Sequence, residues 1–213
     1  FVTSLVRSNL ILLHEGCLNM SIKQRLSKTK YYIKKYRKDG RIVIYCATRK
    51  YVDMMANYLS KHFPGEITKC HAYMDPAKRE KNEIAFIHGK KRIMVATTAF
   101  GMGVDVPDIH LIIHFNLPLS IIDYYQQIGR AGRDGKKAHA VLLYHPDDIS
   151  LAKHIVLTER LTNDVKKSFE MRIQEMVNLV ESNSCIMQQL LSALGEKNPN
   201  TCRHCTNCQR KRR

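Results

Sequence analysis

Residues 42–62 read IVIYCATRKYVDMMANYLSKH, and this stretch contains the unit from which the fold can be argued. Ile42 to Cys46 form an uninterrupted apolar run, which is typical of a strand buried on both faces of a parallel sheet. From Arg49 to His62, apolar side chains recur at intervals of three and four residues and form one face of a helix. A buried strand that leads into an amphipathic helix is the repeating unit of an α/β fold.

The same alternation continues on both sides of this unit. Helices are predicted from Asp75, where an N-cap is followed by Pro76, to Gly89, and again from Ser120. Further apolar runs predict strands at residues 93–96, 111–115 and 140–144 and, more weakly, at 10–13 and 67–71. Strands alternating with helices predict a doubly wound parallel sheet.

Beyond Asp147 the pattern changes to helices only. A helical stripe of apolar residues is followed by a shorter helix at 185–194. The stripe consists of Val165, Phe169, Ile173, Met176, Val177 and Val180. We therefore expect an α/β domain over residues 1–147 and a small helical module over residues 148–213.

The composition favours a polyanionic partner. Lysine and arginine number 35 against 19 acidic residues, which gives a net charge of +16. Basic side chains set against phosphates release condensed counterions, so nucleic acid is the favoured partner, and a solvated basic surface is the alternative. The sequence has no apolar run of membrane-spanning length and no signal-peptide pattern at Phe1, so no membrane partner is expected.

The segment from Asp123 to Gly135, DYYQQIGRAGRDG, is the sharpest chemical signal. If the helix continues to Arg133, then Gln126, Arg130 and Arg133 share one face. Two guanidinium groups held in this way suit the charge of a transferring phosphoryl group. The alternative is an ordinary basic helix end that is stabilised by the helix dipole.

The run YYQQIGRAGRDG resembles motif VI of superfamily-2 helicases, and specifically that of the RecQ family. Gln127 stands where many RecQ proteins carry glutamate. The resemblance implies that Arg130 and Arg133 are arginine fingers that bind the nucleotide, with Gln126 beside them in catalysis. It also implies that the α/β domain is the second RecA-like domain of such a helicase.

Two other stretches agree with this resemblance. Residues 40–49 look like motif IV, and residues 96–105 look like motif V, in which Asp105 is expected to sense the nucleotide. Ligands of open α/β sheets gather at the carboxyl ends of strands, where a nucleic-acid backbone is expected to lie. The residues predicted to contact it are Thr48, Arg49, Thr97 and Thr98. Each threonine taken singly is also compatible with an ordinary strand or turn hydroxyl.

No Gly-x-x-x-x-Gly-Lys-Ser/Thr phosphate loop and no Asp-Glu dipeptide occur in the sequence. In the family both belong to a first RecA-like domain, which we expect to precede Phe1; residues 1–15 resemble the junction. ATP and Mg²⁺ are therefore expected to bind only together with that N-terminal domain. Alone, the chain is expected to be inactive as an ATPase.

Four cysteines near the C-terminus have metal-ligand spacing. Cys185, Cys202, Cys205 and Cys208 give C-x16-C-x2-C-x2-C, which suits one structural Zn²⁺ with four thiolate ligands. Disulfides and an iron–sulfur cluster are the alternatives. With four cysteines present, His204 is expected to be a bystander or a phosphate contact. The arrangement resembles the RecQ zinc module.

The leading hypothesis is the C-terminal part of an ATP-dependent 3′–5′ DNA helicase of recombination and repair. Its expected partners are single-stranded or forked DNA and the N-terminal RecA-like domain. Its expected location is the cytoplasm or nucleoid, or the nucleus in a eukaryote. The alternatives are a non-catalytic zinc-dependent nucleic-acid-binding module and an RNA helicase.

Overall fold

Strands and helices alternate through most of residues 10–144, as the sequence predicts, except that the strands at 93–96 and 109–114 follow one another with no helix among the described residues between them. The structure is a computed structural model, and it describes residues 7–36, 40–98, 100, 105–158, 162–197 and 199–212. The strands are β1 (Leu10–Gly16), β2 (Arg41–Tyr45), β3 (Ile67–Cys70), β4 (Ile93–Ala96), β5 (Ile109–His114) and β6 (Ala138–Tyr144). They form one sheet in the order β1-β6-β5-β2-β4-β3, and every neighbouring pair is parallel. The predicted α/β class and all six strands are therefore confirmed.

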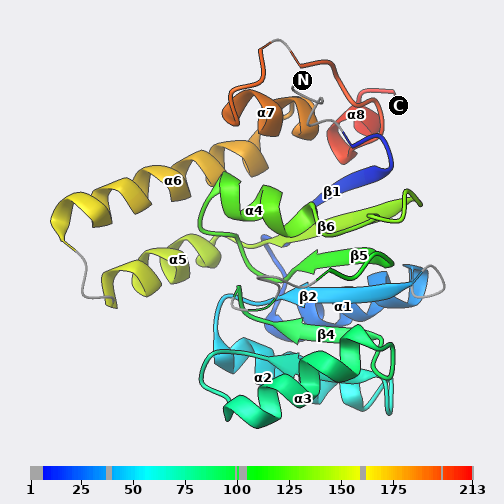
Figure 1. Cartoon of the computed structure of the whole chain (residues 1–213). Coiled ribbons are helices and arrows are strands. Elements are labelled where there is room, and N and C mark those ends of the chain that lie inside the picture. Colours follow the sequence, from blue (N-terminus) through cyan, green and yellow to red (C-terminus); the bar gives the residue numbers. More distant parts are fainter. Residues whose placement is uncertain are drawn as a thin grey trace.

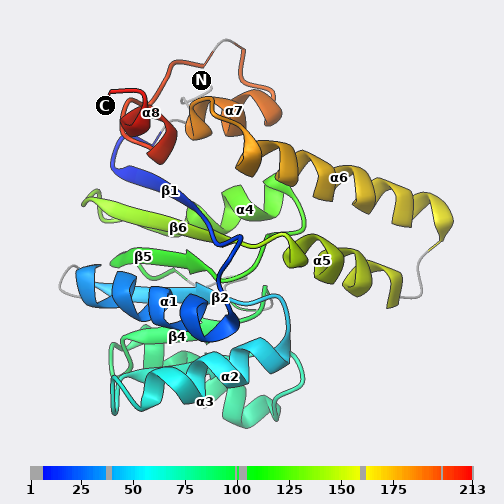
Figure 2. The ribbon, with the colours of Figure 1, turned by 180° about the vertical axis from the view of Figure 1, so that it is seen from behind.

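Helices cover both faces of the sheet, because the side chains of each buried strand point alternately to the two sides. In the α/β part they are α1 (Ile22–Tyr36), α2 (Arg49–Ser60), α3 (Pro76–Ile87) and α4 (Ile121–Ile128). One hydrophobic core joins α1 and α2 to the sheet, and a second joins α3 and α4 to its opposite face. Figure 1 shows α3 and α4 in front of the sheet, and Figure 2 shows α1 and α2 on the other side.

Local capping explains where three of these helices begin. Thr48, Asp75 and Ser120 each precede a helix, and each side-chain oxygen accepts a hydrogen bond from a backbone N–H in the first turn. Helix α1 was not singled out in the sequence. It is rich in lysine and tyrosine, and its buried residues alternate with exposed lysines rather than forming an unbroken apolar run.

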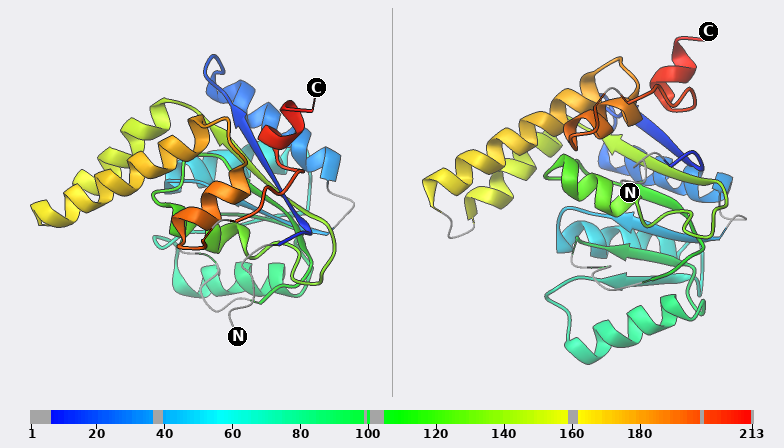
Figure 3. Two further views of the ribbon diagram at one scale, coloured as in Figure 1. Left: turned by 90° about the horizontal axis from the view of Figure 1, so that it is seen from above. Right: turned by 45° about the horizontal axis from the view of Figure 1, so that its top comes forward.

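The helical part consists of α5 (Asp147–Thr158), α6 (Asn163–Glu181), α7 (Ile186–Ala193) and α8 (Thr206–Arg210). Helices α5 and α6 pack side by side and form an arm that projects from the sheet (Figure 3). The core on the α3–α4 face continues without a break into α5, α6 and α7. The helical part is thus stabilised by packing on the α/β part, rather than by a hydrophobic core of its own.

A buried ion pair fastens α1 to the start of α5. Arg25 Nη2 lies 3.1 Å from Asp148 Oδ2, and both side chains are almost fully buried. Arg25 also donates to the backbone oxygens of Phe115 and Leu143, and Asn116 Nδ2 donates to Asp148 at 2.9 Å. These hydrogen bonds offset part of the cost of burying two charges, although the buried Arg25 Nε has no hydrogen-bond partner among the described residues. Among the described helices, none is both long and apolar enough to cross a bilayer.

Candidate functional site

The four residues predicted to contact a nucleic-acid backbone lie just beyond two paired strands. Thr48 and Arg49 follow β2, and Thr97 and Thr98 follow β4, whose last residues pair in register. Thr48 Oγ1 also accepts from the Tyr51 N–H at 3.3 Å, so this threonine caps α2. Thr98 and Arg49 are exposed. The structure therefore brings the four residues to one edge, at the carboxyl ends of neighbouring strands.

Tyr73 adds an aromatic ring to this edge. The ring is 79% exposed, and the Arg49 guanidinium lies 4.5 Å from its centroid. An exposed aromatic ring beside a cation can stack on an unpaired base. A cavity of about 160 Å³ opens near the same edge, and its lining includes Thr98, Asn116 and Gln127.

The helix that begins after Ser120 does not continue to Arg133, so the condition for a shared helical face is not met. Helix α4 ends at Ile128, with Gly129 as its C-cap, and residues 129–137 form a turn-rich segment that leads into β6. We call this segment the arginine loop. A helix could not run through Arg133 in any case, because Gly132 adopts φ +62°, a left-handed conformation that a helix interior does not allow. Gln126, Arg130 and Arg133 are therefore close in sequence but do not form one helical face.

Glycine at position 132 is also required by close packing. A Cβ there would lie 2.7 Å from Asn9 Nδ2 and 2.8 Å from the Lys136 carbonyl oxygen. Both distances are shorter than atoms of these kinds can tolerate without a shift of the neighbours. The shape of the loop therefore requires glycine at position 132, independently of any role of the arginines beside it.

Two residues from the start of the chain hold the arginine loop. Arg7 Nη1 donates to the Gly129 carbonyl at 3.0 Å, and Nη2 donates to the carbonyls of Ala131 and Gly132 at 2.7 and 2.8 Å. Asn9 Nδ2 donates to the carbonyls of Gly132 and Lys136 at 2.8 and 2.9 Å. A planar guanidinium with its fixed fork of donors can satisfy several carbonyls at once. We refer to these contacts of Arg7 and Asn9 as the clamp.

No pattern in the sequence assigns this role to Arg7 or Asn9. Both lie more than 120 residues before the loop, and the pairing of β1 with β6 brings them together. One feature of the sequence could have suggested such a long-range contact. Arg7 and Asn9 lie directly before a predicted strand, in a stretch that has no helical or strand pattern of its own.

Within the clamped loop, Arg133 reaches the residue expected to sense the nucleotide. Arg133 Nη1 lies 2.7 Å from Asp105 Oδ1, and both side chains are exposed. Thr97, Thr98 and Asp105 all belong to the connection between β4 and β5, of which Ala99 and residues 101–104 lie outside the described part. One connection therefore touches the predicted backbone-binding edge at its start and the arginine loop at its end.

The side chain of Arg130 lies in a different environment from that of Arg133. It is half-buried, and its charge acts on the hydroxyl of Tyr45. Burial raises the pKa of Tyr45 to about 12, and the nearby Arg130 guanidinium opposes that rise. The two arginines thus differ in environment: one is partly enclosed by the core, and the other is presented to solvent.

Neutral histidines lie in the core beneath the loop. His114 on β5 is sandwiched between the rings of Tyr45 and Tyr124, and Gln127 Oε1 accepts a 2.7 Å hydrogen bond from its Nε2–H. His14 Nε2 lies 3.0 Å from the Tyr124 hydroxyl. Burial lowers the pKa of His114 to about 4 and that of His14 to about 3, so both rings are uncharged near neutrality. Gln127 is therefore a buried partner of His114.

The four cysteines predicted as metal ligands converge. Cys185 and Cys205 occupy the N-cap positions of α7 and α8. Their sulfur atoms and those of Cys202 and Cys208 all lie within 4.8 Å of one another. The Sγ atoms of Cys185 and Cys202 are 3.5 Å apart, and those of Cys205 and Cys185 are 4.0 Å apart. Four thiolates at ~2.3 Å from one ion would be ~3.8 Å apart. The geometry fits a tetrahedral ion and is far from that of a disulfide, whose S–S distance is about 2.05 Å.

His204 serves the packing of this module. Its Nε2 lies 3.1 Å from the Leu10 carbonyl oxygen on the edge strand β1. Asn207 Nδ2 donates to the carbonyls of Ser182 and Ser184, both at 2.7 Å. The cysteine cluster is thus built into a module that is fixed on one side to the sheet and on the other to the end of α6.

Comparison with protein families gives two matches. The helicase conserved C-terminal domain matches residues 24–135, and the RecQ zinc-binding domain matches residues 146–209. The first match includes the predicted backbone-binding edge and most of the arginine loop, and the second includes all four cysteines.

Among the solved structures, a similar one is that of the Escherichia coli DEAD-box protein SrmB, bound to regulator of ribonuclease activity A. It aligns with a TM-score of 0.55 and 21% identity over 73% of this chain and 92% of that chain. This likeness concerns the fold, and it identifies the sheet as RecA-like.

Curated relatives include the ATP-dependent DNA helicase RecQ of Bacillus subtilis, which is 32% identical over 83% of this chain and 29% of its own length. The RecQ-like DNA helicase BLM of Xenopus laevis is 35% identical over 83% of this chain and 14% of its own. A putative ATP-dependent RNA helicase of Acanthamoeba polyphaga mimivirus is 33% identical over 78% of this chain and 30% of its own. The chain spans less than a third of each of these relatives. It belongs to the RecQ family of helicases and carries the conserved C-terminal helicase domain followed by the RecQ zinc-binding module.

Proposed function

We propose that this chain is the second motor domain and zinc module of an ATP-dependent DNA helicase that moves 3′ to 5′. The observation that carries the proposal is the arginine loop: a clamped turn presents Arg133 to solvent, beside Asp105. A preorganised guanidinium stabilises the charge of a transferring phosphoryl group without further ordering. An arginine finger of this kind contributes about 10³–10⁵ to the rate.

In this proposal ATP and Mg²⁺ are held by the N-terminal RecA-like domain, and Arg130, Arg133 and Gln126 approach the phosphates when the two domains close. Asp105, which pairs with Arg133, responds to the same nucleotide. The connection that contains Asp105 begins at Thr97 and Thr98. Closure is thereby transmitted to the edge where Thr48, Arg49, Thr97 and Thr98 contact single-stranded or forked DNA.

The zinc module has a structural role in the proposal. A Zn²⁺ ion held by Cys185, Cys202, Cys205 and Cys208 joins the start of α7 to α8. This ion stabilises a segment whose own apolar content is small, because α8 and the connection before it contribute few buried side chains. The supporting observations are the convergence of the four sulfur atoms and the family match over residues 146–209.

The deciding experiment measures ATP turnover by the full-length protein with no nucleic acid, with single-stranded DNA and with single-stranded RNA. Stimulation by DNA is expected, and unwinding of duplexes with 3′ but not 5′ tails is expected to establish polarity. The RNA arm is needed because one relative is named as an RNA helicase. If only RNA stimulates ATP turnover, the proposed substrate is RNA rather than DNA. If the protein binds DNA but shows no ATP turnover under any condition, the proposal that it is a helicase motor is wrong.

A further inference from the structure

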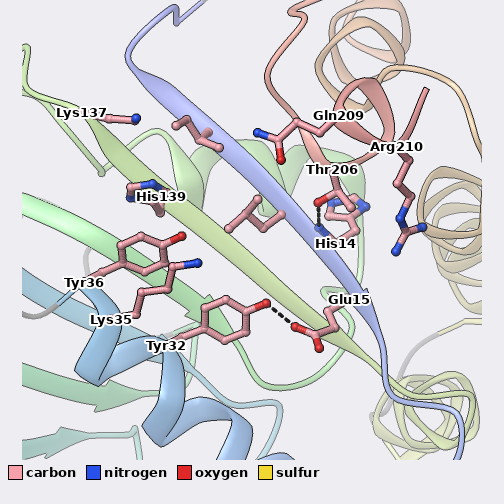
Figure 4. A pocket seen from close by; sticks show the side chains of 12 residues that line it. His14, Glu15, Tyr32, Lys35, Tyr36, Lys137, His139, Thr206, Gln209 and Arg210 are labelled. Carbon is pink, nitrogen blue, oxygen red and sulfur yellow. Dashed lines mark hydrogen bonds between the residues drawn. The ribbon is translucent and has the colours of Figure 1, made fainter. Parts of the chain in front are cut away.

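A groove separate from the residues discussed above lies between α1 and α8. Its floor is formed by β1 and β6, and its volume is about 770 Å³, which is within the usual range for ligand-binding clefts. Figure 4 shows the side chains of α1 on one side, those of α8 on the other, and β1 running between them. Leu13 of the floor packs against the core that underlies α1 and α2, so the groove opens on that face of the sheet.

The charge of the groove is positive on three sides. Lys35 comes from the end of α1, Lys137 from the loop before β6, and Arg210 from the end of α8, and all three are exposed. Within the described part of the chain, no carboxylate lies at ion-pair distance from any of them. The acidic residue of the lining, Glu15, is already paired with Lys28 and accepts a hydrogen bond from Tyr32. The groove therefore presents unopposed positive charge from three elements.

Its walls are held in place by tertiary contacts. Tyr36 stacks on His139 with ring centroids 3.9 Å apart, and Lys35 Nζ lies 5.2 Å from the Tyr36 centroid. On the other side, Thr206 Oγ1 accepts from the His14 backbone N–H at 3.1 Å, which fixes the start of α8 to β1. The cations thus project from a fixed frame that also includes the rings of Tyr32 and Tyr36 and the Gln209 amide (Figure 4).

We propose that this groove binds the phosphodiester backbone of a nucleic-acid strand, as a second contact apart from the edge formed by Thr48, Arg49, Thr97 and Thr98. A groove lined by charge of one sign concentrates the opposite charge, and basic grooves with aromatic walls are a common way to hold single strands. Lys35 and Lys137 lie near the amino end of β6, whereas the predicted edge follows the carboxyl ends of β2 and β4. A strand in the groove would therefore contact a different part of the sheet.

An acidic protein segment is the competing occupant. The spacing of the cations over three elements favours a regularly charged polymer, whose phosphates can meet each cation in turn. The inference rests on the proposed function only in that the ligand is of the same chemical class, because binding to the groove requires neither ATP nor the N-terminal domain.

The test measures binding of a fluorescein-labelled oligothymidylate to this chain by anisotropy at several salt concentrations. The double variant Lys35→Glu/Lys137→Glu is compared with Lys81→Glu/Lys90→Glu, which makes the same charge change at exposed positions on and after α3. The groove variant is expected to bind about tenfold more weakly and to lose about 2 from the slope of log K against log salt, since each lost phosphate contact removes about 1. Thermal melting of both variants establishes that they fold.

Equal affinities of the two double variants would overturn the proposal, and so would competition by poly-glutamate as strong as that by unlabelled oligothymidylate. The assay contains no ATP, so it is independent of the motor. A protein that turns over ATP while its groove variant binds DNA normally would refute the groove alone. A protein that shows the groove effect without DNA-stimulated turnover would refute the motor alone.

Discussion

Arg133 Nη1 and Asp105 Oδ1 lie 2.7 Å apart, so the arginine expected to act on a phosphate is paired with the aspartate expected to sense it. The side chain of Arg133 is 39% exposed and that of Asp105 is 79% exposed. An ion pair this open to water contributes only about 0–1 kcal/mol. A nucleotide phosphate can therefore replace the carboxylate as the partner of Arg133 at little cost, which suits a residue that changes partners during a cycle.

Replacing Arg133 by alanine is expected to remove most ATP turnover in the full-length protein, by about 10³-fold or more, because the developing phosphoryl charge loses its guanidinium. Single-strand binding is expected to persist, since the predicted backbone-binding edge is formed by other residues. Arg133→Lys is expected to restore little, because a single ammonium cannot donate in a planar fork. Turnover and oligonucleotide anisotropy measure the two effects.

The unfolding free energy serves as the control for Arg133→Ala, and it is expected to change by no more than about 1 kcal/mol, as for any exposed pair. Turnover close to that of the unaltered protein would leave the finger assignment without support.

Arg7→Ala is expected to lower both stability and turnover. The carbonyls of Gly129 and Ala131 lose their Arg7 donor, while that of Gly132 keeps Asn9 Nδ2; the loss costs about 1–3 kcal/mol for a partly buried group, and the loop loses part of its fixed shape. Because Arg7 acts through Arg130 and Arg133, kcat is expected to fall more than KM rises. Chemical denaturation, steady-state kinetics and hydrogen exchange of residues 129–136 measure these effects.

Arg172→Ala is a matched control for the clamp, since Arg172 is an exposed arginine on α6 far from the loop in sequence. If Arg7→Ala and Arg172→Ala have equal kcat values and equal exchange in the loop, Arg7 does not position the arginines.

Cys205→Ser is expected to abolish binding of one zinc ion per chain and to unfold α7 and α8, because a site with three thiolates no longer holds the module together. Zinc released on denaturation is measured with a chromogenic chelator, and the module is followed by limited proteolysis. Cys17→Ala, a buried cysteine outside the cluster, is expected to retain zinc. Retained zinc and an unchanged melting profile in Cys205→Ser would contradict the prediction.

Stability is expected to fall as the pH is lowered from about 6.5 toward 4, because burial lowers the pKa values of His14 and His114 from 6.5 to about 3 and about 4. In that window the unfolded chain binds protons that the folded chain excludes, so the stabilisation is present above pH 6.5 and is lost below it. His114 accounts for at most about 3 kcal/mol of this loss in unfolding free energy. Chemical denaturation at a series of pH values measures it.

Gln127→Glu is expected to raise the pKa of His114, because a carboxylate in place of the amide oxygen favours the charged ring. The fall in unfolding free energy on acidification should then become smaller. Gln126→Glu makes the same chemical change at an exposed neighbour and is expected to leave His114 unaltered. Titration of the histidine ring protons by NMR compares the two variants, and equal shifts would exclude a specific Gln127–His114 contact.

Much of the architecture could be predicted because it follows from local patterns. A run such as Ile93–Ala96 is apolar at every position, and a strand that is buried on both faces needs this pattern. Asp75 and Ser120 mark helix starts through hydrogen bonds to residues three positions on. The spacing of Cys202, Cys205 and Cys208 predicted the cluster for the same reason, since these residues need only a tight turn to converge.

Only the tertiary structure decided how distant segments meet. The sequence left open whether the helix from Ser120 continues to Arg133. In the structure Gly132 takes a left-handed conformation that is stabilised by Asn9 and Arg7, and these contacts exist only after β1 has paired with β6. The Arg25–Asp148 pair and the groove between α1 and α8 depend likewise on non-local packing. Hydrophobic periodicity and capping are short-range effects and can be read along the chain. Hydrogen bonds between residues more than 100 positions apart are set by strand order, and no local pattern in this sequence encodes that order.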